Sequence, residues 1–370
     1  MAHVTPPFRA DQVGSLLRSR KLADARARRE KNEITAVELK AIEDDEIRQL
    51  IKQQEDVGLQ GITDGEYRRS WWHFDFLALL NGVEQYEPDE GIKFHGVTTK
   101  RRALRIVGKV DFPADHLFIE HFKFVKANTN RTPKMTVPAP AVLHFRAARK
   151  DISSAAYRDL DAFFDDVAKT YRKIVKGFYE AGCRYLQFDD TIWAYLCSKD
   201  EMEKARERGW PVDELPGIYK RVINHALAEK PADMTITTHV CRGNFRSSWV
   251  SEGGYEPVAE LLLGEVNYDG YFLEYDTDRA GGFEPLRFLP KGEKRVVLGL
   301  VTSKTGNLED KGAIERRIEE AAKYAPLEQF CLSPQCGFAS TEEGNILTEE
   351  AQWNKLRLIV EIARETWGGL

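Results

Sequence analysis

Two residues near the middle of the chain, His239 and Cys241, have the types and the spacing of a metal-binding pair. They come at the end of an apolar run, residues 234–238, which is typical of a β-strand. Side chains of an extended segment alternate between its two faces, so these two side chains point the same way. A neutral imidazole and a thiolate in this arrangement can occupy two corners of a tetrahedral Zn²⁺ site. Because such a pair is also common among ordinary core residues, the prediction depends on further ligands.

Two more ligand types stand at the ends of later strand-like runs. Glu274 closes the run 271–274, and Cys336 follows the run 330–335. If these runs are neighbouring parallel strands, their ends bring all of these side chains to one rim of the sheet. Helix caps explain single polar residues at such positions, but they do not explain a set of four zinc-type ligands. The predicted ligands of one Zn²⁺ ion are His239, Cys241, Glu274 and Cys336.

The elements that must position these residues alternate between strands and helices about eight times along the 370-residue chain. This pattern predicts an α/β protein with a (β/α)8 TIM barrel, in which chemistry takes place at the carboxyl ends of the strands. The runs are apolar throughout, as parallel strands covered on both faces must be. A doubly wound open sheet is the alternative, but no glycine-rich phosphate turn follows the first strand. The predicted strands are residues 8–13, 61–64, 134–137, 184–188, 294–300 and 329–332, with two more beginning at residues 235 and 271.

The segment of residues 82–129 fits this alternation poorly. Within it, residues 104–110 have the pattern of a strand in a surface hairpin. The segment is too short and too polar to form a core of its own. We therefore expect a β-hairpin-type insertion after the second strand, outside the barrel, and a single catalytic domain over residues 1–370.

The composition narrows the class of protein. With 42% hydrophobic and 31% charged residues, the chain is typical of soluble globular proteins. A net charge of −5 argues against nucleic acid as a partner, and no apolar run approaches the roughly 20 residues that cross a bilayer. The first residues lack the features of a signal peptide, and five scattered cysteines form no disulfide framework. We therefore expect a cytoplasmic protein with no membrane or nucleic-acid partner; the sequence does not indicate the oligomeric state.

Six short motifs, in one order along the chain, resemble those of a known family. The chain is similar over most of its length to the catalytic half of cobalamin-independent methionine synthase, and more closely to the short single-barrel members of that family. Six motifs in order are far more specific than any one of them. The motifs are Val-Gly-Ser at residues 13–15, Asp-Gly-Glu at 64–66, Gln-Phe-Asp at 187–189, Thr-His-Val-Cys at 238–241, Glu274, and Ser-Pro-Gln-Cys-Gly at 333–337.

The resemblance implies a zinc-dependent methyltransferase that acts on the thiol of homocysteine and forms methionine. The family's zinc ligands fall on the four residues named above, and its homocysteine pocket falls on Ser15, Glu66 and Asp189. A free thiol, with a pKa of about 8.5, is mostly protonated at neutral pH, whereas a zinc-bound thiol loses its proton and remains a nucleophile. The carboxylates of Glu66 and Asp189 would hold the ammonium group of the amino acid.

The residues expected to act on the methyl donor differ from those of the family. Full-length members place a histidine after the seventh strand, where it helps to protonate a folate leaving group, and the nearest group here is Lys304. Lys304 is therefore the predicted general acid, although lysine is a much weaker acid than histidine. We expect methyl-folate turnover to be slow beside turnover with a donor that leaves without a proton, such as methylcobalamin or a sulfonium. Aromatic residues at the rim predict either a wall for the donor or simple loop packing; they are Trp71, Trp72 and Trp193.

Two other functions remain open from the sequence. One is a zinc-dependent alkyltransferase that acts on a different thiol, such as coenzyme M. The pair Glu66 and Asp189 argues against it, because carboxylates repel a sulfonate. The other is a non-catalytic barrel whose zinc is structural, which a closed set of four ligands would favour. A carboxylate ligand such as Glu274 is easily displaced by a thiolate, and this favours catalysis.

Overall fold

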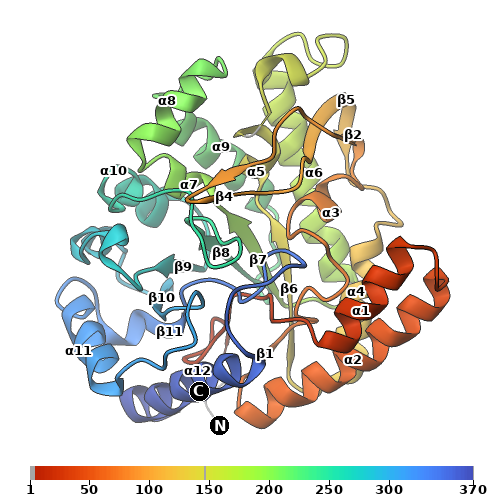
Figure 1. The fold of residues 1–370 in the computed structure, drawn as a ribbon. Helices are drawn as coiled ribbons and strands as arrows, with labels where there is room; N and C mark the ends of the chain where they lie inside the picture. Colours follow the sequence, from red (N-terminus) through yellow and green to blue (C-terminus); the bar gives the residue numbers. More distant parts are fainter. Residues whose placement is uncertain (1–4, 146, 370) are drawn as a thin grey trace.

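The computed structural model describes residues 5–145 and 147–369, and in this part of the chain seven parallel strands form one curled sheet. Strands that are neighbours in the sheet are also consecutive among these seven in the chain. Figure 1 shows the helices of the connections around the outside of the sheet. The prediction of an α/β fold built on a parallel sheet is thus confirmed. The strands are β1 (Gly61–Ile62), β6 (Thr132–Pro138), β7 (Tyr185–Asp190), β8 (Thr235–Val240), β9 (Gly270–Glu274), β10 (Arg295–Val301) and β11 (Phe330–Pro334).

The longer helices are amphipathic, and their apolar faces pack with strand residues in the main hydrophobic core. The longer helices are α1 (Arg20–Glu30), α2 (Ala36–Val57), α4 (Leu117–Asn128), α6 (Leu160–Glu180), α9 (Leu215–Leu227), α11 (Lys311–Ala321) and α12 (Glu349–Trp367). The shorter helices are α3 (Phe74–Leu77), α5 (Pro140–Phe145), α7 (Ile192–Tyr195), α8 (Lys199–Glu207) and α10 (Glu256–Ala259). Single turns of other helix types are η1 (Arg149–Asp151), η2 (Glu260–Glu265), η3 (Asp278–Ala280), η4 (Glu284–Phe288) and η5 (Leu327–Gln329).

The predicted first strand, residues 8–13, is present only as an isolated bridge. Ala10 pairs in parallel with Leu332 of β11, and the Asp11 N–H donates to the Leu332 carbonyl at 3.0 Å. The carboxylate of Asp11 accepts the backbone N–H groups of Phe8 and Gln12, so these groups bond locally instead of to a neighbouring strand. The segment lies beside β11, as the first strand of a barrel would, but an eight-stranded closed barrel stays a prediction.

Residues 81–111 stand apart from the parallel sheet. Here β2 (Asn81–Tyr86) pairs antiparallel with β5 (Ala103–Asp111), and β3 (Lys93–Phe94) pairs with β4 (Val97–Thr98). The turn between β3 and β4 reaches the loop after β8, where the His95 N–H donates to the Trp249 carbonyl at 2.9 Å. This excursion, defined as residues 81–111, therefore contacts the carboxyl end of the sheet.

The end of the segment predicted to lie outside the repeat, residues 82–129, differs from the prediction. Helix α4 occupies residues 117–128 and packs against α2, α6 and β6. It buries Phe118, Phe122 and Val125, which recur at helical spacing. The polar residues between them obscured this apolar face in the sequence. Because the helix packs against the sheet and its neighbouring helices, it belongs to the layer around the sheet.

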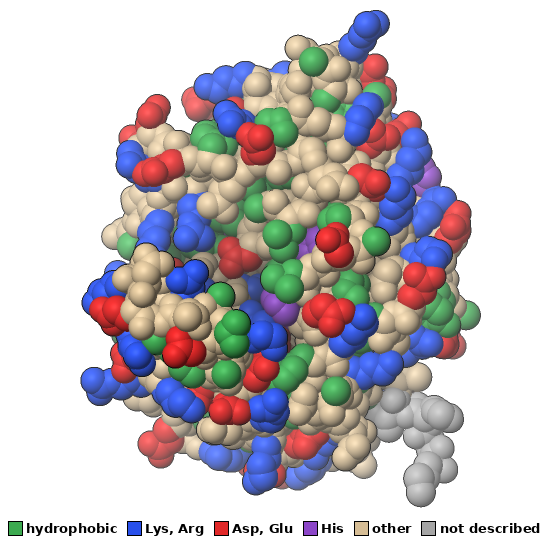
Figure 2. Space-filling view, turned by 90° about the vertical axis from the view of Figure 1, so that its right-hand side faces the viewer, with side chains coloured by type: hydrophobic (Ala, Val, Ile, Leu, Met, Phe, Trp, Pro, Cys, Tyr) green, Lys and Arg blue, Asp and Glu red, His purple; other side chains and the backbone are tan. Residues whose placement is uncertain are grey.

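Charged residues of both signs are interspersed on the surface. Figure 2 shows Lys and Arg side chains alternating with Asp and Glu side chains over the face that it presents. Among the described residues, no helix combines the length and the apolar character that a membrane crossing requires.

Candidate metal centre and substrate pocket

Four buried side chains meet at the carboxyl end of the sheet, and they are the four predicted metal ligands. His239 lies in β8, Cys241 directly follows that strand, Glu274 ends β9, and Cys336 lies two residues beyond β11. One nitrogen, two sulfurs and one carboxylate oxygen of this cluster all lie within 4.8 Å of one another. The Sγ atoms of Cys241 and Cys336 are 3.5 Å apart, too far for a disulfide, whose S–S distance is about 2.05 Å.

A glycine in the strand between β9 and β11 lets the two strand ends approach. Gly299 of β10 pairs with the end of β9 on one side and with β11 on the other. A Cβ atom at this position would lie 2.8 Å from both the Gln335 Cα atom and the Leu273 carbonyl oxygen. A larger residue would therefore push apart the strands that carry two of the four clustered side chains.

Several polar atoms of the cluster are buried without a partner. Both ring nitrogens of His239 and the Oε2 atom of Glu274 have no hydrogen bond of normal geometry among the described residues. The other carboxylate oxygen of Glu274, Oε1, accepts the backbone N–H of Arg242 at 3.0 Å. Buried polar atoms without a partner are costly, and one cation in the cluster would satisfy one ring nitrogen of His239 and the Oε2 atom of Glu274.

The buried groups of the cluster shift one another's pKa values. The hydrogen bond between Cys241 and Cys336 raises the pKa of Cys241 well above its usual value and lowers the pKa of Cys336 well below it. Burial raises the pKa of Glu274 to about 7. Burial alone would lower the pKa of His239, but the neighbouring Cys336 sulfur raises it above the ordinary value. A bound divalent cation would stabilise the thiolate and carboxylate forms instead.

A narrow pocket of about 40 Å³ opens on the cluster. Its lining includes three residues of the cluster, all three residues predicted to bind the amino-acid substrate, and two of the predicted wall residues. These are His239, Cys241, Cys336, Ser15, Glu66, Asp189, Trp71 and Trp72. The structure therefore brings three of the four predicted metal-binding residues and the three predicted substrate-binding residues to one small pocket.

Glu66 is held in a conformation that is uncommon for residues other than glycine. Its backbone φ is 60°, in the left-handed region. The Oε1 atom accepts a hydrogen bond from Thr136 Oγ1 at 2.9 Å and pairs with Arg69 at 3.2 Å. The buried Oε2 atom has no partner among the described residues. Burial raises the pKa of Glu66 in spite of Arg69, so a cationic ligand group beside Oε2 would stabilise the carboxylate.

Asp189 adds a second buried carboxylate. It lies opposite His239 in the register of β7 and β8, and its Oδ1 atom accepts a hydrogen bond from Gln187 Nε2 at 2.7 Å. Burial raises the pKa of Asp189 to about 7; His239 opposes this shift and Glu66 adds to it. Two buried carboxylates in one small pocket disfavour each other's charge, and an ammonium group near both would relieve this.

Ser15 is placed by a close approach of two loops. Its Oγ atom accepts the backbone N–H of Ala339 at 3.3 Å, which leaves its own O–H free to donate. A Cβ atom at Gly337 would lie 1.9 Å from this hydroxyl oxygen. Glycine at position 337 is therefore what allows the serine to reach the pocket.

Lys304, the predicted general acid, is buried with its ammonium group against the loop that follows β8. Its Nζ atom donates to the Gly243 carbonyl at 3.1 Å, to Asn244 Oδ1 at 3.2 Å and to the Ser248 carbonyl at 3.4 Å. These acceptors match the three N–H bonds of an ammonium group. The Asn244 amide in turn donates to the Gly337 carbonyl at 2.7 Å. Lys304 thus supports the loop after β8 and, through Asn244, the contact of that loop with the loop that carries Cys336. It is not among the residues that line the narrow pocket.

Trp193 lies outside the pocket, contrary to its prediction as a wall residue. It is fully buried in the hydrophobic core on the short helix α7. Tyr195, two residues later on the same helix, lines the pocket instead. Side chains two positions apart point to nearly opposite sides of a helix, so only one of the two can face the pocket.

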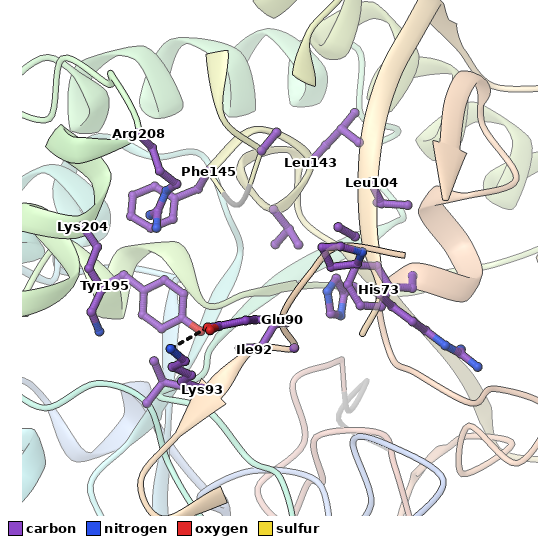
Figure 3. Close-up of a pocket in the computed structure, with 18 of the residues that line it drawn as sticks. His73, Glu90, Ile92, Lys93, Leu104, Leu143, Phe145, Tyr195, Lys204 and Arg208 are labelled. Atoms are coloured by element: carbon purple, nitrogen blue, oxygen red, sulfur yellow. Dashed lines mark ion pairs between the residues drawn. The ribbon is translucent and has the colours of Figure 1, made fainter. Parts of the chain in front are cut away.

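A larger cavity of about 470 Å³ adjoins the narrow pocket. It lies between the excursion and helices α5, α7 and α8, and Figure 3 shows His73 and Tyr195 on opposite sides of it. His73, Ile92 and Tyr195 line both the cavity and the pocket. His73 was not among the residues predicted from the sequence, although it stands in the aromatic run of residues 71–74.

The fold and the site together define an α/β protein whose candidate site lies at the carboxyl ends of parallel strands. Residues 8–365 match the family model described as cobalamin-independent synthase, catalytic domain. The chain therefore belongs to the cobalamin-independent methionine synthase family, a family of methionine-synthase-type methyltransferases.

Three relatives show how far this similarity extends. The uncharacterized protein YxjG of Bacillus subtilis is 50% identical over 98% of this chain and 95% of its own length. A methionine synthase of Pyrococcus abyssi is 25% identical over 95% of this chain and 90% of its own length. A crystal structure of a candidate vitamin-B12-independent methionine synthase from Listeria monocytogenes has a TM-score of 0.81 and 45% identity, and the match covers 98% of this chain and 99% of that one.

Proposed function

We propose that this chain is a zinc-dependent methyltransferase that transfers a methyl group to the thiol of homocysteine and forms methionine. The observation that carries the proposal is the shared pocket, because the cysteines and the histidine of the cluster line the same narrow space as Glu66 and Asp189. A thiol at the cluster would lie beside two buried acceptors for an ammonium group. Membership of the methionine synthase family supports the same reaction.

The cluster suits a zinc ion held by His239, Cys241, Glu274 and Cys336. Two sulfurs that each lie about 2.3 Å from a tetrahedral ion are about 3.8 Å apart, close to the 3.5 Å between these two cysteines. The unpartnered nitrogens of His239 and the Oε2 atom of Glu274 also support a metal here. When bound, zinc would remove the proton of the substrate thiol and leave a nucleophile.

The residues of the chain would orient the amino-acid end of homocysteine. The Oε2 atom of Glu66 and the carboxylate of Asp189 would accept hydrogen bonds from its ammonium group. The Ser15 hydroxyl would donate to its carboxylate. Fixing the amino acid in this way would direct the thiol toward the cluster and lower the entropic cost of the reaction.

The methyl donor would enter through the larger cavity, because this cavity opens on the same walls as the narrow pocket. Trp71 and Trp72 would form part of the surface that excludes water from the reacting atoms. We assign Lys304 to holding the two cysteine loops together. We also propose that residues 8–13 complete a single-domain (β/α)8 barrel.

The two buried carboxylates of the narrow pocket argue against the alternative substrate, coenzyme M. A sulfonate in the narrow pocket would face Glu66 and Asp189, which repel it, whereas an ammonium group would pair with both. The thiol substrate we propose is therefore an amino acid.

The test is to purify the protein, measure its zinc content and assay methyl transfer. Homocysteine and coenzyme M would each be offered with a methyl folate, methylcobalamin and a methyl sulfonium as donors. We expect about one zinc per chain and activity with homocysteine only. Activity with coenzyme M but not homocysteine, or full activity after complete removal of zinc, would refute the proposal.

A further inference from the structure

We propose that the hairpin of residues 91–100 is a gate over the narrow pocket, which opens to admit homocysteine and closes again over it. This inference rests on the proposed function, because it concerns how the same substrate reaches the same pocket. Its basis is that the hairpin forms a wall of a pocket too small for this substrate. Figure 1 shows the hairpin, in orange at the label β4, extending from β2 and β5 toward α7.

The size of the narrow pocket requires one of its walls to move. The pocket has a volume of about 40 Å³. A single water molecule needs about 10–15 Å³ of such space, so the pocket has room for roughly three waters. Homocysteine, with an ammonium group, a carboxylate and a thiol-bearing side chain, is larger than this. The substrate therefore enters only after a wall has been displaced.

The hairpin is the wall that moves most easily. Glu66 and Asp189, near the strand ends, are only 3% and 7% exposed, and Trp71 is 2% exposed. Of the hairpin residues, Thr99 is buried, and the others are exposed or half-buried. A segment with few buried contacts opens at a lower cost in free energy than the packed strand ends do.

The hairpin closes the pocket with two apolar side chains, Ile92 and Phe94. The ring of Phe94 packs against that of Phe245, with 5.5 Å between centroids. Phe245 in turn stacks on Trp71 at 6.2 Å. Apolar contacts of this kind are non-directional, so they can break and form again without leaving a buried polar group unpaired.

Hydrogen bonds within the hairpin allow it to move as one unit. Strands β3 and β4 pair with each other, the Ile92 N–H donates to Thr99 Oγ1 at 2.8 Å, and the Thr99 N–H donates to the Ile92 carbonyl at 3.0 Å. Gly96, with a φ of 79°, lies in the turn. A Cβ atom at Gly91 would lie 2.0 Å from the Thr99 carbonyl oxygen, so glycine allows the two arms to meet at the base.

Contacts at the tip and at the base hold the hairpin against the rim of the sheet. At the tip, the His95 N–H donates to the Trp249 carbonyl at 2.9 Å, and the His95 carbonyl accepts the Ser248 hydroxyl at 2.5 Å. The rings of His95 and Trp249 stack, with 4.8 Å between centroids. At the base, Lys100 pairs with Glu342 at 2.8 Å. These contacts, which join the hairpin to the loops after β8 and β11, are the latch of the gate.

A gate has a kinetic signature that an ordinary binding residue lacks. If the pocket is closed both when it is empty and when it is occupied, a weaker latch favours opening of both states equally. Association and dissociation of the substrate then accelerate by the same factor, and the dissociation constant stays unchanged. A residue that merely contacts the substrate changes the dissociation constant, mostly through the dissociation rate.

The first test measures homocysteine binding to the zinc-loaded protein by stopped-flow tryptophan fluorescence. Ser248→Ala removes one hydrogen bond of the latch, and Lys100→Met, added to it, removes the ion pair. We expect both rate constants to rise about three- to tenfold in the single variant and further in the double variant, with an unchanged dissociation constant. Thr98→Ala, which removes an exposed hydroxyl of the hairpin that is not part of the latch, is the matched control and should change neither rate.

The second test closes the gate covalently. His95→Cys combined with Trp249→Cys places two thiols at the tip, where the backbones of these positions are hydrogen-bonded. Dibromobimane joins neighbouring thiols through two thioether bonds and releases two bromide ions, and homocysteine does not cleave this bridge. We expect the bridged protein to keep its zinc and to bind homocysteine about a hundredfold more slowly or not at all. The unbridged double variant should bind faster than the wild type, and each single cysteine variant should be insensitive to the reagent.

Two outcomes would overturn the gate. One is a set of wild-type rate constants, or a change of the dissociation constant alone, in both latch variants. The other is an undiminished association rate in the bridged protein with its zinc in place. If bridging displaces zinc, the latch variants alone decide. Failure of the zinc-loaded wild type to bind homocysteine would instead refute the proposed function.

Discussion

The narrow pocket and the larger cavity lie side by side but are built in different ways. Side chains at strand ends form most of the functional part of the pocket, and Glu66 and Asp189 there are only 3% and 7% exposed. The cavity is formed by the excursion and by short helices, and three of its charged residues, Glu90, Lys93 and Lys204, are exposed to solvent. Lys93 and Glu90, for example, form an ion pair at 2.6 Å with side chains that are 70% and 68% exposed.

This difference separates the two halves of the proposed reaction. Strand ends in a packed sheet hold side chains rigidly, which suits a step that needs fixed ligands and buried charge. Loops and exposed ion pairs adapt more easily, and each such pair contributes little to stability. Changes in the pocket should therefore affect the reaction with every donor, whereas changes at the cavity should discriminate between donors.

The largest effect is expected from the cysteines of the cluster. Cys241→Ser and Cys336→Ser each replace a thiolate ligand with a poor one, so zinc and activity with all donors should be lost. Metal analysis and a methyl-transfer assay check this. Cys331→Ser, at a buried cysteine outside the cluster, is the control and should keep its zinc. Full zinc in both cluster variants would show that the metal lies elsewhere.

The next effect concerns the carboxylates of the pocket. Glu66→Gln and Asp189→Asn each remove a charge that would face the substrate ammonium. A hydrogen bond to a charged group is worth about 1.5–3 kcal/mol, so homocysteine should bind roughly tenfold more weakly or worse. Zinc content should not change. A calorimetric titration of both variants with homocysteine tests this prediction. Unaltered affinity would show that these residues do not bind the amino-acid substrate.

The pocket could be predicted from the sequence much better than the cavity. His239 and Cys241 lie two residues apart at the end of one strand, and strand ends in a parallel sheet meet at one rim, so spacing alone placed them together. His73 and Tyr195 line the same cavity only because the segment that begins α3 and the helix α7 both pack over that rim. No local pattern in the sequence predicts that two residues so far apart in the chain line one cavity.

Two other features show the same limit. The contacts of Lys304 depend on the path of the loop that contains Gly243 and Asn244, which residue types alone do not fix. The first predicted strand was interrupted by hydrogen bonds of the Asp11 carboxylate, a local competition that its apolar pattern does not reveal.

A smaller effect is expected for Lys304→Met. This change would leave the Gly243 and Ser248 carbonyls and the Asn244 side chain without their shared donor, and each buried group left unpaired costs about 1–3 kcal/mol. The loops that carry the cysteines should loosen, so zinc should pass to a chelator several-fold faster. Rates with folate and sulfonium donors should fall together. A loss confined to the folate would show that Lys304 is the acid after all.

The smallest effect is a change of stability with pH in the metal-free protein. Burial raises the pKa of Asp189 to about 7, whereas an aspartate in an unfolded chain has a pKa of about 3.9. Between these values the folded state keeps a proton that the unfolded state has lost, so the aspartate lowers the free energy of unfolding as pH rises from about 4 to about 7, and no further above that. Asp189→Asn has no such proton. Relative to the wild type it should gain stability on the order of 2 kcal/mol between pH 5 and pH 8. Urea unfolding of both proteins in the presence of a chelator measures this difference.

Asp213→Asn, at a side chain that is 89% exposed, should show no comparable change. If the difference between Asp189→Asn and the wild type were the same at both pH values, Asp189 would already be ionised in the folded protein, and the pocket would hold its charge without a ligand.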